Sequence, residues 1–101
     1  MILSVIYQLQ PGQKFDLDYY MKKHIPLVEE RLTGLGLKSI QVLHGTGSPG
    51  GPPPVKLIAL LDYESLQAFQ SAMEKHGAEI MGDIAKFTDT QPQIQFNDKL
   101  S

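Results

Sequence analysis

The chain alternates between two hydrophobic periods, one typical of strands and one typical of helices. Short runs with β-branched and aromatic side chains, or with strict alternation, predict four strands. Longer stretches with apolar residues at every third or fourth position predict two helices. The predicted strands cover residues 2–9, 37–44, 55–61 and 93–97, and the predicted helices cover residues 17–34 and 64–86. The element order is therefore β-α-β-β-α-β.

The first predicted helix has clear signals at both ends. Asp16 can cap the free amides of its first turn, while Phe15 and Tyr20 have the spacing of a hydrophobic staple. Gly34 and Gly36 supply the stop. The apolar stripe of this helix, which should face the sheet, contains Leu17, Tyr20, Met21, His24, Val28, Leu32 and Leu35.

The second predicted helix has a similar stripe but a less regular interior. Gly77 and Gly82 fall within it and are expected to break or bend it. The stripe contains Leu66, Phe69, Met73, His76, Ile80, Ile84 and Phe87.

This element order predicts an α+β, ferredoxin-like fold, a four-stranded antiparallel sheet with both helices on one face. In that topology the first and third strands are central, and these are the most apolar strands here. Strand 55–61 is apolar on both faces, with Leu57 and Ala59 on one and Ile58 and Leu60 on the other. Helices cover only one face, so a second copy of the chain is the simplest cover for the other. We therefore expect a homodimer.

Composition narrows the class of protein. Residues 1–101 are expected to form a single domain, and a net charge of −2 gives no basic surface for nucleic acid. Cysteine is absent, which is compatible with a reducing compartment. No apolar run is long enough to span a bilayer. The expectation is a cytoplasmic protein with neither a nucleic acid nor a membrane partner.

One motif match is rejected. Residues 45–50 read Gly-Thr-Gly-Ser-Pro-Gly, which fits the dinucleotide-binding pattern G-x-G-x-x-G. That chemistry needs a helix directly after the glycines, so that its free amides meet the pyrophosphate. Here Gly51 and three prolines follow, which favours an extended loop. We expect a flexible hairpin loop and no nucleotide cofactor.

The three histidines, His24, His44 and His76, are isolated in sequence and have no spacing typical of a metal site, so no metal or other cofactor is expected. His24 has two interpretations. It is either a core histidine bonded to the backbone near Pro26, or a general acid/base in a pocket between helix and sheet. His76 is expected to be structural or at the surface, and His44 could line a pocket mouth.

The tyrosines are the other candidates for polar chemistry. Tyr20 lies on the helix stripe, and its hydroxyl needs a partner if it is buried. Tyr19 points elsewhere, toward a surface or interface. Tyr7 and Tyr63 come from the central strands, and either could contribute a phenol to a cavity.

The first helix resembles the signature of the EthD family, which is named after a protein linked to ethyl tert-butyl ether degradation. The matching residues are Phe15-Asp16, Tyr19-Tyr20, His24 and Pro26-Leu27. A second, weaker resemblance covers residues 82–89, an acidic and aromatic segment before the last strand. Length and element order fit as well, so the resemblance covers the whole chain.

The resemblance implies a dimeric α+β barrel in which two ferredoxin-like sheets pack face to face. Some members of the family are named reductases by association with degradation operons, and some fungal relatives decarboxylate aromatic polyketides. Related barrels include isomerases and cofactor-independent oxygenases. The resemblance favours a functional role for His24.

Two functions remain open on the sequence. In the first, the chain is a cofactor-independent enzyme for a hydrophobic, aromatic or lactone-like molecule, in a degradation pathway as an oxidoreductase, isomerase or decarboxylase. His24 would then move a proton, Tyr20 and Tyr63 would position the substrate's oxygen, and Met21 and Tyr7 would line the cavity. In the second, the chain is a non-catalytic dimer that binds a small ligand or assists an oxygenase, and His24 is structural.

Overall fold

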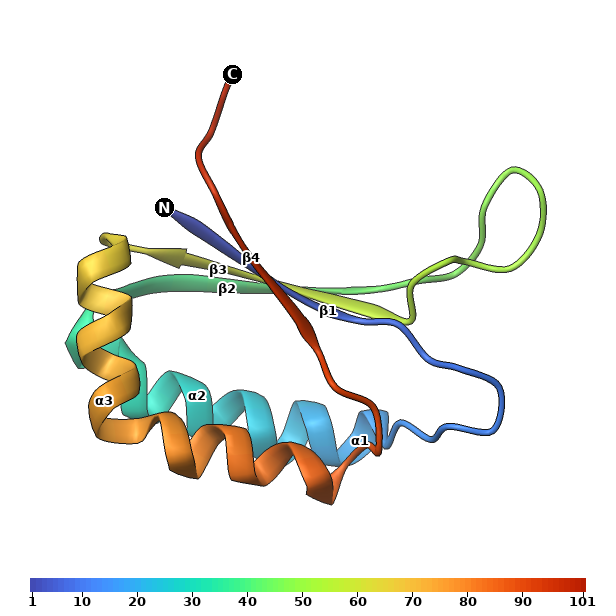
Figure 1. Cartoon of the computed structure of the whole chain (residues 1–101), viewed down its shortest axis with the longest axis horizontal. Coiled ribbons are helices and arrows are strands. Elements are labelled where there is room, and N and C mark those ends of the chain that lie inside the picture. Colours follow the sequence, from blue (N-terminus) through green and yellow to red (C-terminus); the bar gives the residue numbers. More distant parts are fainter.

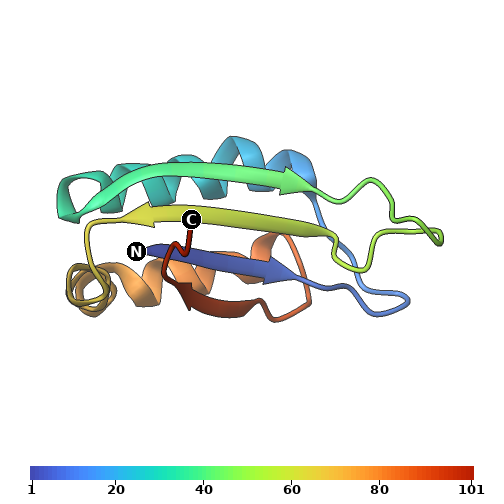
Figure 2. The ribbon, with the colours of Figure 1, turned by 90° about the horizontal axis from the view of Figure 1, so that it is seen from above.

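The computed structural model covers all residues of the chain and confirms the predicted fold class. Its four antiparallel strands form one sheet in the order β2-β3-β1-β4, so the first and third strands are central (Figure 2). The strands are β1 (Ile2–Tyr7), β2 (Leu37–His44), β3 (Leu57–Tyr63) and β4 (Gln93–Asn97). This is the ferredoxin-like α+β arrangement.

All helical segments lie on one face of this sheet, and the other face carries none (Figure 1). Seen from above, α2 runs along β2 at one edge of the sheet, while α3 runs beneath β1 and β4 (Figure 2). The first helical region consists of α1 (Leu17–Tyr19), a π-helical turn (Tyr20–His24), α2 (Ile25–Leu32) and a 3₁₀ turn (Thr33–Leu35). The second consists of α3 (Leu66–Asp83) and a 3₁₀ turn (Ile84–Lys86).

The end signals of the first helix act as predicted. The Asp16 carboxylate accepts a hydrogen bond from the Tyr19 amide at 3.0 Å, and the rings of Phe15 and Tyr20 lie 5.3 Å apart. Gly36 ends the helix with a φ of +109°. A Cβ at Gly36 would stand 3.0 Å from the Tyr63 ring, so both the conformation and the close packing require glycine here.

Three strand boundaries differ from the prediction: β3 begins and ends two residues later, and β1 ends two residues earlier. β3 begins at Leu57 instead of residue 55, because the preceding prolines provide no amides and Lys56 donates to the Tyr7 carbonyl at 2.9 Å. β1 ends at Tyr7 instead of residue 9, since Tyr7 pairs with Leu57 and no partner lies beyond it. The two central strands therefore end together.

α3 runs without a break through Gly77 and Gly82, so the expected break is wrong. The helix does bend, but in its first turns, which stand at a steep angle to the rest (Figure 1). No helix in the structure is both long and apolar enough to cross a lipid bilayer.

The glycine- and proline-rich segment 45–56 joins β2 to β3 and projects beyond the end of the sheet (Figures 1 and 2). No helix follows its glycines, which confirms that this segment is not a dinucleotide-binding turn.

The buried core between sheet and helices divides into two clusters. The first, which we call the leucine-rich cluster, comprises Leu3, Val28, Leu32, Leu37, Ala59, Leu61, Tyr63, Ala72 and Ile80. The second, which we call the aromatic cluster, comprises Tyr7, Tyr20, Ile25, Leu57, Ile84 and Phe87.

The face of the sheet opposite the helices also carries apolar side chains. One row on this face, near the end of the sheet where β1 and β2 finish, joins Leu43, Ile58 and Ile6 across three neighbouring strands. Leu43 is 49% exposed, and Ile58 and Ile6 are half-buried. This row is left without a helix to cover it.

Candidate active site

A π-helical turn shapes the segment that carries the predicted histidine. The Ile25 amide bonds to the carbonyl of Tyr20, five residues back instead of four. Pro26 follows directly, and a proline lacks an amide and clashes with the carbonyl four residues before it. The wider turn accommodates Pro26 and keeps Tyr20 and His24 stacked on one face, with ring centroids 5.5 Å apart.

His24 is paired with a buried carboxylate from the other helix. Its Nδ1 lies 3.0 Å from Oδ2 of Asp83, at the last residue of α3. His24 is 5% exposed and Asp83 8% exposed, so the pair is shielded from bulk water. A charge-assisted bond in such surroundings holds the imidazole in one orientation.

The second oxygen of Asp83 is bound from outside the cavity. The Tyr19 hydroxyl donates to Oδ1 at 2.8 Å, and the Lys86 ammonium lies 3.7 Å from the same oxygen. Tyr19, expected at a surface or interface, thus has a structural partner. Both oxygens of Asp83 are occupied, which fixes the carboxylate that orients His24.

These contacts set the charge states. Burial lowers the pKa of His24 below its ordinary value, and the hydrogen bond and negative charge of Asp83 only partly oppose this. Burial alone would raise the pKa of Asp83, but the hydrogen bonds from His24 and Tyr19 and the charge of Lys86 lower it overall. At neutral pH the pair is therefore a neutral imidazole donating its Nδ1 proton to an ionised carboxylate.

Backbone contacts tie the two halves of this site together. Phe15 and Thr88 form an isolated antiparallel bridge, and the Asp16 amide donates to the Phe87 carbonyl at 2.7 Å. The Lys14 amide donates to the Asp89 carboxylate at 3.1 Å. The helix start and the segment after α3, far apart in sequence, are thus held side by side.

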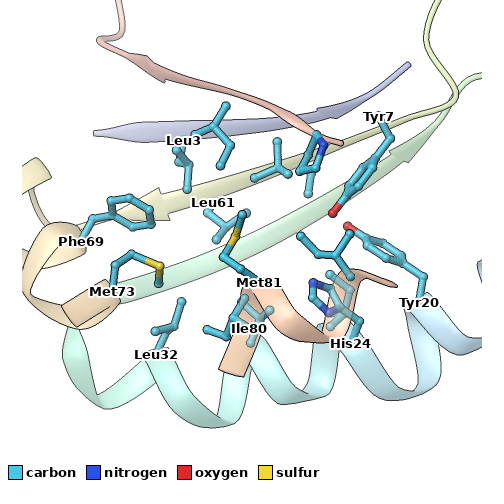
Figure 3. Close-up of a pocket in the computed structure, with 17 residues that line it drawn as sticks. Leu3, Tyr7, Tyr20, His24, Leu32, Leu61, Phe69, Met73, Ile80 and Met81 are labelled. Atoms are coloured by element: carbon cyan, nitrogen blue, oxygen red, sulfur yellow. The ribbon is translucent and has the colours of Figure 1, made fainter. Parts of the chain in front are cut away.

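Next to His24 lies a cavity of about 70 Å³ between the helices and the sheet (Figure 3). Both helical regions and strands β1, β3 and β4 line it. Its lining is almost entirely aliphatic or aromatic, and Met81, which is 45% exposed, lies where the lining meets solvent. This is the composition of a pocket for a hydrophobic small molecule.

Only three lining residues carry a side-chain nitrogen or oxygen: Tyr7, Tyr20 and His24. The Nε2 atom of His24 has no hydrogen-bond partner in the protein and is not sealed by neighbouring atoms. In Figure 3 the imidazole points from the helix toward the interior of the cavity. An otherwise apolar cavity therefore meets one basic nitrogen whose other side is fixed.

The residues predicted for the site are only partly brought together. Tyr7, Tyr20 and His24 meet at the cavity, whereas Met21 and Tyr63 do not line it. Met21 is 48% exposed, because the π-turn takes more residues per turn than an α-helix and rotates position 21 off the stripe. Tyr63 is fully buried in the leucine-rich cluster.

The other two histidines are not part of the site either. His44 is exposed at the end of β2 and does not line the cavity, and His76 is half-exposed on α3. No group of three or more histidine, cysteine or acidic side chains is positioned to hold a metal ion.

Asp83 is the site residue that the sequence interpretation missed. It lies within the segment of the second family resemblance, but no role was assigned to it. A signal was present, because Asp83 occupies the apolar stripe of α3 between Ile80 and Phe87. An acidic residue at a buried position needs a partner, and His24 was the candidate on the facing helix.

Fold and site define a class: a small ferredoxin-like α+β protein with a buried histidine–aspartate pair beside an apolar cavity. A family model described as EthD domain matches residues 13–91. The chain belongs to the EthD family. Its structure is similar to that of an EthD-like protein from Ralstonia eutropha JMP134, with 34% identity, a TM-score of 0.90, and coverage of 99% of this chain and 91% of that one.

More distant structures share the fold. An EthD family protein from Bacillus halodurans C-125 is 24% identical with a TM-score of 0.65, over 96% of this chain and 97% of the other. An antibiotic biosynthesis monooxygenase is 10% identical with a TM-score of 0.53, over the full length of both chains. A search of curated proteins gave no significant match.

Proposed function

We propose that the chain is a small enzyme in which His24 moves a proton to or from a hydrophobic small molecule. The observation that carries this proposal is the orientation of the imidazole, which points into the cavity with Nδ1 bound to Asp83 and Nε2 without a partner in the protein (Figure 3). A neutral imidazole in this tautomer presents a lone pair to the cavity and acts as a general base. Once protonated, the same nitrogen acts as a general acid.

The lining of the cavity supports an aromatic or lactone-like substrate, of the kind handled in a degradation pathway. Proton transfer is a step in isomerisation and in decarboxylation, so both reaction types fit this site. The cavity of about 70 Å³ is smaller than the ~150 Å³ cavity that takes up benzene in another protein. A ring must therefore displace part of the lining, and the flexible side chains of Met73 and Met81 are suited to move.

We further propose that the chain works as a homodimer in which two sheets pack face to face. Support comes from the uncovered apolar row of Leu43, Ile58 and Ile6, which a second sheet would remove from water. Ile58→Glu places a charge at the centre of this row. The variant is expected to sediment as a monomer at micromolar concentration, and a wild-type protein that is itself monomeric there contradicts the proposal.

The catalytic proposal is tested by comparing two histidine variants. Mass spectrometry of molecules released from the purified protein, followed by a panel of aromatic compounds and lactones, supplies the substrate. His24→Gln should fold and bind this molecule but turn it over about 10²-fold or more slowly, because its proton carrier is gone. His76→Gln removes a half-exposed histidine and serves as the matched control, with the wild-type rate expected.

Two results would contradict the catalytic proposal. If His24→Gln retains the wild-type rate, His24 is not the proton carrier. If the wild-type protein binds molecules from the panel and changes none of them, the chain is a binding or accessory protein instead of an enzyme.

A further inference from the structure

Two buried tyrosine hydroxyls in the cavity have no partner in the protein. Tyr7 and Tyr20 are each 1% exposed, and a phenol hydroxyl buried to this degree normally makes a hydrogen bond. The only side-chain polar atom that is both sealed and unpaired is the hydroxyl of Tyr63. The hydroxyls of Tyr7 and Tyr20 instead open onto the cavity, and Figure 3 shows them pointing toward one another.

The rings that carry these hydroxyls lie close to the imidazole ring. The ring of Tyr20 is 6.0 Å from that of Tyr7 and 5.5 Å from that of His24, measured between centroids. All three residues line the same cavity of about 70 Å³. A molecule bound at this end of the cavity therefore lies beside all three side chains.

We propose that Tyr7 and Tyr20 together bind the oxygen of a carbonyl substrate and hold the negative charge that develops on it while His24 removes a proton from the adjacent carbon. This deepens the function proposed above and depends on it, because His24 is the base. The substrate class is a compact, hydrophobic carbonyl compound with an acidic C–H next to its C=O group. Two donors aimed at one oxygen, in a site that excludes water, are the arrangement that stabilises an enolate.

The step balances without a further reactant. Nε2 of neutral His24 takes the proton, the C–H electron pair becomes the C=C bond of the enolate, and the C=O π pair moves to the oxygen. That oxygen accepts hydrogen bonds from both tyrosines. The imidazolium then returns the proton to a carbon of the enolate, and the C=O bond forms again. If the imidazolium first exchanges its Nε2 proton with solvent, return to the same carbon gives hydrogen exchange; return to a conjugated carbon gives an isomer.

The tyrosines are suited to act as donors only. Burial raises the pKa of both phenols above the ordinary value, and for Tyr7 the neighbouring Tyr20 raises it further. Both groups therefore stay protonated at the pH at which His24 is neutral. They donate hydrogen bonds to the oxygen without giving up their protons.

The test uses cyclopentanone, a compact ring ketone, as the probe. Proton abstraction is measured in D₂O as exchange of the hydrogens next to the carbonyl, followed by NMR. Oxygen binding is measured separately as a shift of the carbonyl stretch to lower frequency. The variants Tyr7→Phe and Tyr20→Phe remove one hydroxyl each and keep the ring. Tyr63→Phe is the matched control, because it removes a buried hydroxyl that lies away from the cavity.

We expect the wild-type protein and Tyr63→Phe to accelerate exchange equally. Each cavity variant should slow it by about 10²-fold, and the double variant should slow it further. The double variant should also lose the carbonyl shift. The inference is overturned if the wild-type protein accelerates no exchange of this ketone, or if the double variant matches the wild-type protein in rate and carbonyl shift.

His24→Gln separates this inference from the function on which it rests. It should abolish exchange yet keep the carbonyl shift, since both hydroxyls remain. If it abolishes exchange while the tyrosine variants change nothing, His24 is the base but the oxygen site is wrong. If it exchanges the probe at the wild-type rate, the proposed function fails as well.

Discussion

The leucine-rich cluster and the aromatic cluster lie on the same face of one sheet and are buried to a similar extent, but their polar atoms are treated differently. In the leucine-rich cluster the Tyr63 hydroxyl is sealed by protein atoms and has no partner. In the aromatic cluster the Tyr7 and Tyr20 hydroxyls open onto a cavity beside a histidine. Burial alone therefore does not indicate a functional tyrosine. A functional tyrosine is indicated by a cavity in front of its hydroxyl.

The largest expected effect is a loss of turnover after a change at the His24–Asp83 pair, beside the aromatic cluster. Asp83→Asn removes the charge that holds His24 in its tautomer, and the amide can present either a donor or an acceptor to Nδ1. We expect turnover to fall by up to about 10⁴-fold, the loss seen in triads whose orienting carboxylate is replaced by an amide. The pKa of His24, followed by NMR of its ring, should fall further, because the only contributions that raise it are lost.

Tyr19→Phe provides the control for this variant. It removes one hydrogen bond to Asp83 but keeps the carboxylate and its bond to His24. Its loss of turnover should be much smaller than that of Asp83→Asn. Equal losses in the two variants would mean that general disturbance of the site, and not the orienting charge, explains the effect.

The next largest effect is a loss of stability after a change in the leucine-rich cluster. Leu37→Ala removes a buried side chain of the leucine-rich cluster that does not line the cavity. The free energy of unfolding, measured in urea, should fall by about 2–5 kcal/mol. The folded fraction should keep the wild-type His24 titration, and a shifted titration would show that the two clusters are not independent.

The pH dependence of stability tests the charge state of His24, which lies beside the aromatic cluster. The pKa of His24 is lowered in the folded state, so the unfolded chain binds this proton more readily. Stability is then fully present above the unfolded value of ~6.5 and is lost as the pH falls through the lowered folded value. The low pKa of Asp83 acts in the same direction at more acidic pH.

The measurement compares the free energy of unfolding at pH 7.0 and pH 5.5 in wild-type protein and His24→Gln. The wild-type protein should lose more stability on acidification than the variant does. His44 and His76 are present in both proteins, so the difference isolates His24. A variant that loses as much stability as the wild-type protein would contradict the assigned charge state. Catalysis should follow the same group, with kcat/KM rising to a plateau and a midpoint below ~6.5.

The smallest effect is expected at the sealed hydroxyl. Tyr63→Phe removes a buried group that makes no hydrogen bond, so the free energy of unfolding should rise by about 1 kcal/mol. Tyr7→Phe and Tyr20→Phe should change it less, since their hydroxyls face a cavity. A destabilised Tyr63→Phe protein would reveal a partner for this hydroxyl, and the contrast between the clusters would then weaken.

Much of the fold was predictable because its signals are local or periodic. Asp16 caps the first helix, Phe15 and Tyr20 form the staple, and the alternation in the strands predicts which faces meet the helices. Strand order followed from the element order and from the apolar character of the two central strands. Each of these features depends on residues that lie near one another in the sequence or share one period.

The site was predictable only in part, because its contacts are long-range. His24 and Tyr20 lie one turn apart on a stripe, but Asp83 is 59 residues away from His24 and meets it only through tertiary packing. Tyr7 and Tyr63 occupy the same face of neighbouring central strands, and no local signal shows which of them reaches a cavity. Met21 was misplaced because an α-helical period was applied across a π-turn.

That π-turn has a consequence for how the site could be gained or lost. A turn closed over five residues contains one residue more than an ordinary helical turn, while the helix on either side continues in its usual form. Deleting a single residue between Tyr20 and His24 would change no residue type at the site, yet it would rotate one half of the helix relative to the other. The spacing of Tyr20 and His24 would fall from four residues to three, so the present stacking of their rings, with centroids 5.5 Å apart, would be lost or altered. The length of this segment, as well as its chemistry, is thus under constraint.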